Sequence, residues 1–301
     1  MALIHRRAIS ICAALALIAI ARTPAKADPP RVIASIAPLH SLVASVMAGV
    51  GAPDLLLPGP VSPHDFALAP SDVRRIAAAD LVVWIGAPLE SFLVKPLDGA
   101  GQRQLGLLAM PALDALPFGD GGDDGDRAGR DPHIWLDPVR AIAIVSAVKD
   151  RLSRIDPDNA VVYRANAAAL SDRLAALDEA IAARLQPVAS RPFIAFHDAY
   201  GYFSRRYGLQ PAGHFAVDPQ RRPGARTIAR LADLVRTGAV ACAFVEPQFD
   251  ARIVTAIAAD QPLRIGRLDP VGADLEPGPA LYETLLKANT EAIADCLAGT
   301  G

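Results

Sequence analysis

Short apolar runs alternate with longer amphipathic stretches through the first third of the chain. The runs that read as strands, rich in Val, Ile and Leu, cover residues 32–36, 55–57 and 81–85. The stretches that read as helices cover residues 38–49, 71–79 and 88–97. This alternation is typical of a parallel sheet that is covered by helices on both faces. It predicts an α/β lobe.

A long uninterrupted helix is predicted in the middle of the chain. A helix is expected from residue 138 to about residue 154, and between Pro157 and Leu185 there is neither a Gly nor a further Pro. Apolar residues recur there at spacings of three and four, which predicts one buried stripe: Leu170, Leu174, Leu177, Ile181 and Leu185. A helix of that length spans about 40 Å and acts as a rigid connector.

The strand–helix alternation returns after this helix and predicts a second α/β lobe. The expected strands cover residues 193–196, 214–217, 240–245 and 264–268. The expected helices cover residues 200–207, 225–237, 250–259 and 281–297. We therefore expect an α/β fold with an N-terminal lobe (28–138), a helical connector (139–187) and a C-terminal lobe (188–301). Ligands bind at the carboxyl ends of strands in open sheets, so the cleft between the lobes is the expected site.

The first 27 residues have the pattern of a cleaved signal peptide. Arg6 and Arg7 precede an apolar run, and a small-x-small site ends at Ala27. Cys12 lies inside the apolar run, where a lipidated cysteine is not expected. Removal of this segment takes away four positive charges, Arg6, Arg7, Arg22 and Lys26, so the net charge changes from −2 to −6. We expect an exported, unlipidated periplasmic protein with no nucleic-acid surface.

An acidic, glycine-rich segment covers residues 118–131. It weakly resembles a calcium-binding loop that would begin at Asp120. The third position of that loop needs a carboxylate, and here it is Gly122. A solvated loop is the main expectation, and weak metal capture or the docking of a periplasmic metallochaperone are the alternatives.

Two cysteines, Cys242 and Cys296, remain after the signal peptide. In an oxidising compartment such a pair is expected to form a disulfide, and here it would tie the last helix to its sheet. A pair of thiolate metal ligands is the alternative.

Three histidines lie in or just after apolar segments: His64, His133 and His197. The two prolines around His133, Pro132 and Pro138, exclude a helix interior and predict an extended segment. Neutral imidazole is a standard zinc ligand, and three protein ligands with a fourth group complete a tetrahedron. His40, in a predicted helix, is expected to be a surface or supporting residue. His214, in a predicted strand, is expected to be structural or to support a ligand rather than to be one.

Four segments resemble the motifs of ZnuA-type solute-binding proteins, the cluster A-I zinc receptors of ABC importers. They are SPHDFALAPSD (62–72), HIWLDP (133–138), FHDAYGYF (196–203) and VEPQF (245–249). The resemblance implies that His64, His133 and His197 bind zinc between two lobes, and that the cysteine pair is the family's disulfide. It implies Asp269 or a water as the fourth ligand, since the Glu that precedes the first histidine in some members is Pro63 here. The histidine-rich loop of many members is absent.

The expected function is therefore that of a monomeric zinc receptor, not an enzyme, which delivers Zn²⁺ to an ABC permease in the inner membrane. Carboxylates that bond to the ligand histidines should fix their tautomers, and the candidates are Asp65, Asp198 and Glu246. A receptor for manganese or another divalent metal is the alternative, although manganese receptors of the wider family typically use two histidines and two carboxylates. A zinc hydrolase is another alternative. The chain has no H-E-x-x-H motif, so Asp198 or Glu246 would have to act as its general base. An adhesin on the same scaffold is a further alternative.

Overall fold

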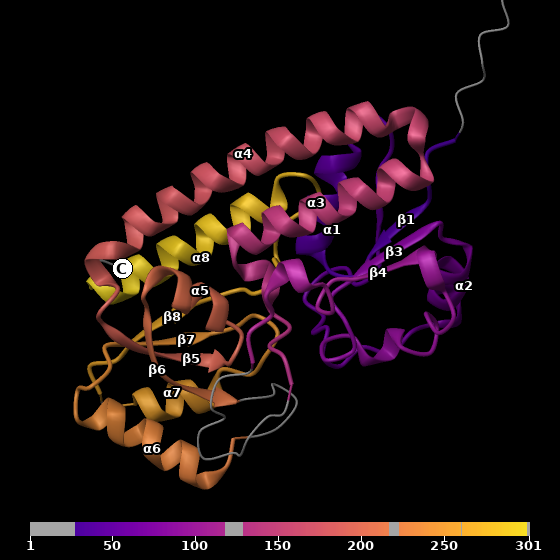
Figure 1. The fold of residues 1–301 in the computed structure, drawn as a ribbon. Helices are drawn as coiled ribbons and strands as arrows, with labels where there is room; N and C mark the ends of the chain where they lie inside the picture. The colour runs from indigo at the N-terminus through magenta and orange to yellow at the C-terminus, as the bar shows by residue number, and fades with distance from the viewer. Residues whose placement is uncertain (1–27, 118–128, 217–222, 260, 300–301) are drawn as a thin grey trace, which may run out of the picture.

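Two parallel sheets, each of four strands, lie at opposite ends of the molecule (Figure 1). The computed structural model describes residues 28–117, 129–216, 223–259 and 261–299. The predicted signal peptide and most of the acidic segment, residues 118–128, lie outside these described residues.

The first sheet has the strand order β2-β1-β3-β4. Its strands are β1 (Val32–Ala34), β2 (Asp54–Leu55), β3 (Leu81–Trp84) and β4 (Gln104–Gly106), and its helices include α1 (Ala37–Met47) and α2 (Pro70–Ala78). All residues of β1 and β3 are buried, as expected for central strands of a covered parallel sheet. The predicted α/β architecture of this part of the chain is confirmed.

Two predictions in this lobe differ from the structure. The helix expected at residues 88–97 is reduced to one 3₁₀ turn, Ser91–Leu93. Pro88 and Pro96 bracket this turn, and each removes a backbone donor that an α-helix needs. Strand β4 was not predicted, because only one of its three residues, Leu105, is apolar.

The second sheet has the strand order β6-β5-β7-β8. Its strands are β5 (Pro192–His197), β6 (Gln210–Ala216), β7 (Cys242–Val245) and β8 (Arg264–Arg267). The helices of this lobe are α5 (Gly201–Tyr207), α6 (Ala225–Arg236), α7 (Arg252–Ala258) and α8 (Leu281–Ala298). The predicted disulfide is confirmed: Cys242 of β7 is bonded to Cys296 of α8, with their Cα atoms 6.1 Å apart.

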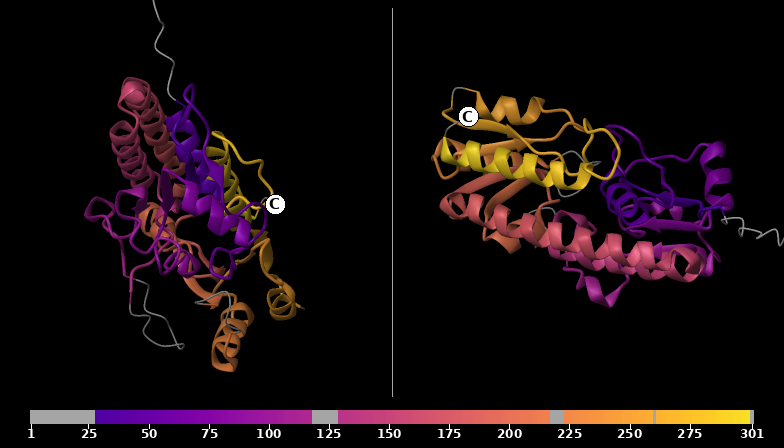
Figure 2. Two further views of the ribbon diagram at one scale, coloured as in Figure 1. Left: turned by 90° about the vertical axis from the view of Figure 1, so that its right-hand side faces the viewer. Right: turned by 90° about the horizontal axis from the view of Figure 1, so that it is seen from above.

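Two antiparallel helices, α3 (Pro138–Ile155) and α4 (Ala160–Leu185), connect the sheets. Asp137 caps α3, since its carboxylate accepts hydrogen bonds from the backbone of Val139 and Arg140. Helix α4 passes alongside both lobes and packs against α1 near one end and α8 near the other (Figures 1 and 2). Its predicted apolar stripe is buried.

One continuous hydrophobic core runs from the first sheet through α3 and α4 into the second sheet. Smaller clusters cover the outer faces of the two sheets. The two sheets are therefore packed together on the connector side, and a binding site is expected on the opposite side. No helix within the described residues is long and apolar enough to cross a membrane.

Candidate metal centre

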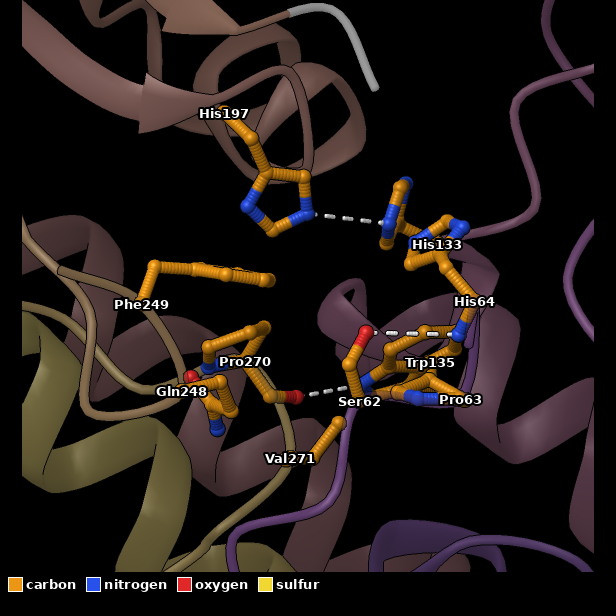
Figure 3. A pocket seen from close by; sticks show the side chains of 10 residues that line it. All are labelled: Ser62, Pro63, His64, His133, Trp135, His197, Gln248, Phe249, Pro270 and Val271. Atoms are coloured by element: carbon orange, nitrogen blue, oxygen red, sulfur yellow. Dashed lines mark hydrogen bonds between the residues drawn. The ribbon is translucent and has the colours of Figure 1, made fainter. Parts of the chain in front are cut away.

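Three histidine side chains from three distant segments meet between the lobes (Figure 3). His64 lies in the loop after β2, His133 in the turn before α3, and His197 is the last residue of β5. One nitrogen from each ring lies within 4.8 Å of the other two. The Nε2 atoms of His133 and His197 are 3.4 Å apart. Tetrahedral zinc bonds of about 2.0–2.1 Å place two ligand nitrogens about 3.3–3.4 Å apart, so this pair has the spacing of zinc ligands.

His133 is held by a tight turn rather than by the extended segment that its flanking prolines predicted. Residues Ile134–Leu136 form a 3₁₀ turn, closed by a hydrogen bond from the backbone N of Leu136 to the carbonyl of His133 (3.1 Å). The prolines exclude an α-helix, but a single 3₁₀ turn needs no backbone donor from either of them. The turn leaves the His133 side chain buried, with 2% of its surface exposed.

A carboxylate lies behind each of two histidines. The Nδ1 of His133 is 2.7 Å from Oδ1 of Asp131, and the Nδ1 of His197 is 2.7 Å from Oε1 of Glu246. A carboxylate only accepts hydrogen bonds, so each Nδ1 carries a proton, and in the neutral form of each ring Nε2 presents a lone pair. Both imidazoles are therefore oriented as neutral metal ligands.

The three predicted supporting carboxylates have different surroundings. Glu246 is buried and makes the contact with His197 that its predicted role requires. Asp65 is exposed, and Asp198 is half-buried with its backbone N bonded to Ala216. Asp131 was missed, although its position two residues before a candidate ligand histidine was a usable signal.

Asp269 lies outside the three-histidine group. Its carboxylate accepts hydrogen bonds from the backbone N of Val271 (3.0 Å), Gly272 (2.9 Å) and Ala273 (2.6 Å). It also accepts one from Nε2 of Gln248 (3.1 Å). In the structure this side chain organises the turn 269–273.

The remaining two described histidines also lie outside the group. His40 is in α1, where its Nε2 is 3.1 Å from the carbonyl of Pro53, and burial lowers the pKa of its imidazole. His214 is in β6, as predicted.

The cavity in front of the imidazoles is small and apolar. Its walls come from both halves of the chain and include Pro63, Trp135, Phe249, Pro270 and Val271 (Figure 3). Trp135 joins the halves directly, because its indole Nε1 donates to the carbonyl of Pro270 (2.7 Å). The cavity volume is about 10 Å³, which suits one ion or water and excludes an organic molecule.

Comparison with known proteins identifies the family of this chain. The family model described as "Zinc-uptake complex component A periplasmic" matches residues 32–296. A high-affinity zinc uptake system protein ZnuA from Brucella abortus is 36% identical, with 88% of this chain and 91% of that protein covered. Its counterpart from Paracoccus denitrificans is 34% identical, with 92% and 94% covered. A crystal structure of a ZnuA deletion mutant with zinc bound is 27% identical, covers 89% of this chain and 98% of that one, and has a TM-score of 0.77. The chain thus belongs to the ZnuA family of periplasmic zinc-uptake components.

Proposed function

We propose that this protein binds one Zn²⁺ through Nε2 of His133 and His197 and one ring nitrogen of His64, and delivers it to an ABC permease. The observation that carries the proposal is the convergence of these three nitrogens within 4.8 Å of one another. The pairing of two of the imidazoles with buried carboxylates supports it, because such pairing raises the basicity of a metal ligand.

We propose that a water molecule, rather than Asp269, completes the tetrahedron. The Asp269 carboxylate already accepts three backbone hydrogen bonds and one from Gln248, and all of them would weaken if it turned toward the metal. A site of three imidazoles and one water suits zinc better than manganese, which prefers oxygen ligands.

Membership of the family also supports a proposal about where the protein works. We propose that the chain is exported with its first 27 residues removed after Ala27, carries no lipid, and works in the periplasm as a monomer of two lobes joined by residues 139–187. The small apolar cavity supports a role in carrying an ion rather than in catalysis on an organic substrate.

The test is a zinc titration of the protein from residue 28 onward, beside a His133→Ala variant and a His40→Ala control. We expect one tightly bound zinc in the parent protein and the control, and a loss of at least about 100-fold in affinity in the variant. Competition with Mn²⁺ separates the two metals. Equal zinc affinity in the parent protein and in His133→Ala would refute the site, and tighter manganese than zinc would refute the proposed cargo.

A further inference from the structure

Three buried polar atoms just after strands β5 and β7 have no hydrogen-bond partner among the residues that the structure describes. They are the hydroxyl of Tyr200, Oε2 of Glu246 and Oε1 of Gln248. Tyr200 is 4% exposed and Glu246 3% exposed. Gln248 is half-buried, but its Oε1 atom is itself buried, so bulk water does not satisfy any of the three atoms. A buried polar atom without a partner is costly, and three such atoms in one region call for an explanation.

The order of the second sheet brings these atoms to one edge. Strand β7 lies between β5 and β8, and all three run parallel. Tyr200 comes just after β5, Glu246 and Gln248 just after β7, and Asp269 just after β8. Burial, with the charges of Glu246 and Asp269, raises the pKa of the Tyr200 hydroxyl well above its ordinary value. That hydroxyl therefore keeps its proton and can donate a hydrogen bond.

Asp269 fixes which way the Gln248 amide points. The Asp269 carboxylate can only accept a hydrogen bond, so the atom facing it is the amide nitrogen of Gln248 (3.1 Å). The amide oxygen, Oε1, is then the buried atom that lacks a donor. Gln248 itself stands in the wall of the cavity beside Phe249 and Pro270 (Figure 3).

The unpaired atoms match the bonding capacity of one water molecule. Tyr200 offers one donor, and Glu246 and Gln248 offer one acceptor each. A water can donate two hydrogen bonds and accept up to two, so one molecule can satisfy all three atoms. We propose that a buried water accepts from the Tyr200 hydroxyl and donates to Oε2 of Glu246 and Oε1 of Gln248. Tyr200 and Gln248 are then positioning residues that hold Glu246 against His197, and through it set the affinity for the metal.

This water would connect the metal ligand to the turn 269–273. The chain of contacts runs from His197 to Glu246, through the water to Gln248, and on to Asp269. Asp269 would then influence zinc binding without touching the ion. The inference rests on the proposed function, because it assigns these residues to the support of that same site.

The test measures zinc affinity in Tyr200→Phe, Gln248→Met and Glu246→Gln, alone and in pairs. We expect Tyr200→Phe and Gln248→Met each to weaken zinc binding by about 3- to 10-fold, less than the 10- to 100-fold typical of a direct partner of a ligand histidine. Because both act through Glu246, each should have little further effect in the Glu246→Gln background. A crystal structure of the zinc-bound protein should show one water bonded to all three side chains.

Tyr163→Phe is the matched control, since it removes a buried hydroxyl that binds Asp156 (2.6 Å) at the junction of α3 and α4. It should lower the melting temperature and leave zinc affinity unchanged. The inference fails if Tyr200→Phe and Gln248→Met bind zinc within twofold of the parent protein, or if their losses add fully to that of Glu246→Gln. It also fails if only Tyr200→Phe has an effect, since that indicates a direct bond to Glu246. Absence of zinc binding by the parent protein would instead refute the proposed function.

Discussion

Asp131 binds His133 twice: one of its carboxylate oxygens, Oδ1, lies 2.9 Å from the backbone N and 2.7 Å from the ring Nδ1 of the histidine two residues later. This single oxygen fixes both the start of the turn and the orientation of the imidazole. Asp131 is 4% exposed, so bulk water screens its charge only weakly.

Replacing Asp131 with Asn should weaken zinc binding by about 10- to 100-fold, because a neutral amide is a poorer acceptor for the imidazole N–H and raises its basicity less. Competition with a chromophoric chelator measures this change. Asp65→Asn, at an exposed position in the His64 loop, is the control and should bind zinc like the parent protein. Unchanged affinity in Asp131→Asn would contradict the assigned role.

Replacing Asp269 with Ala should reduce stability more than it reduces metal binding. The change leaves the backbone N–H groups of Val271, Gly272 and Ala273 without their acceptor, which costs about 1–3 kcal/mol. Urea denaturation of the metal-free protein measures this loss. The variant should still bind one zinc, with an affinity lowered by less than about tenfold. Loss of zinc on the scale of His133→Ala would instead identify Asp269 as a ligand.

Glu90 should make the stability of the first lobe depend on pH. The side chain is fully buried, accepts hydrogen bonds from the Ser35 hydroxyl and from the backbone N of Gly86, and burial raises its pKa to about 7. The folded protein therefore holds this proton more tightly than the unfolded chain, where a Glu pKa is about 4.3. Protonated Glu90 therefore contributes fully to the free energy of unfolding below about pH 4.3, and this contribution is lost as the pH rises to about 7.

Glu90→Gln removes this titration. Its free energy of unfolding should therefore rise, relative to that of the parent protein, as the pH increases from 5 to 8. The gain across the whole window is about 3 kcal/mol at most. Urea denaturation at a series of pH values measures it, with the exposed Glu276→Gln as the control. A stability difference that does not change with pH would show that Glu90 does not titrate in this range.

Removing the disulfide should destabilise the fold and leave the metal site intact. Cys242 and Cys296 are separated by 54 residues in sequence, and a crosslink over such a loop contributes about 4 kcal/mol in the chain-entropy model. The double variant Cys242→Ala/Cys296→Ala should lose stability on this scale in denaturant, whereas its zinc stoichiometry should remain one. A loss of zinc binding in the folded variant would indicate that the bridge also shapes the site.

The sequence was most informative where a pattern repeats. The alternation of strands and helices and the buried stripe of α4 depend on periodic burial, which neighbouring residues reveal together. The histidine cluster could also be predicted, because its three members lie in or just after apolar segments and within motifs that resemble those of the zinc receptors.

Short turns and tertiary contacts were harder to predict. Apolar periodicity describes neither the prolines that remove the helix at 88–97 nor the single 3₁₀ turn at Ile134–Leu136. The partners of Asp131 and Asp269 are chosen by hydrogen-bond donors that come close only in the folded chain. The resemblance suggested a ligand role for Asp269. The structure shows instead that its carboxylate accepts hydrogen bonds from the backbone of the turn 269–273.

The chain has two tryptophans, and their placement gives the protein its own optical probe. The ring of Trp135 lies 5.3 Å from that of His133 and its Nε1 is bonded to Pro270, whereas Trp84 is bonded to Gln104 in the first lobe. A change in charge on the His133 imidazole, or a separation of the lobes, alters the surroundings of the Trp135 indole. The surroundings of the Trp84 indole stay the same. Intrinsic emission, with Trp84→Phe to remove the constant background, should therefore follow cargo loading and release in real time without an added dye.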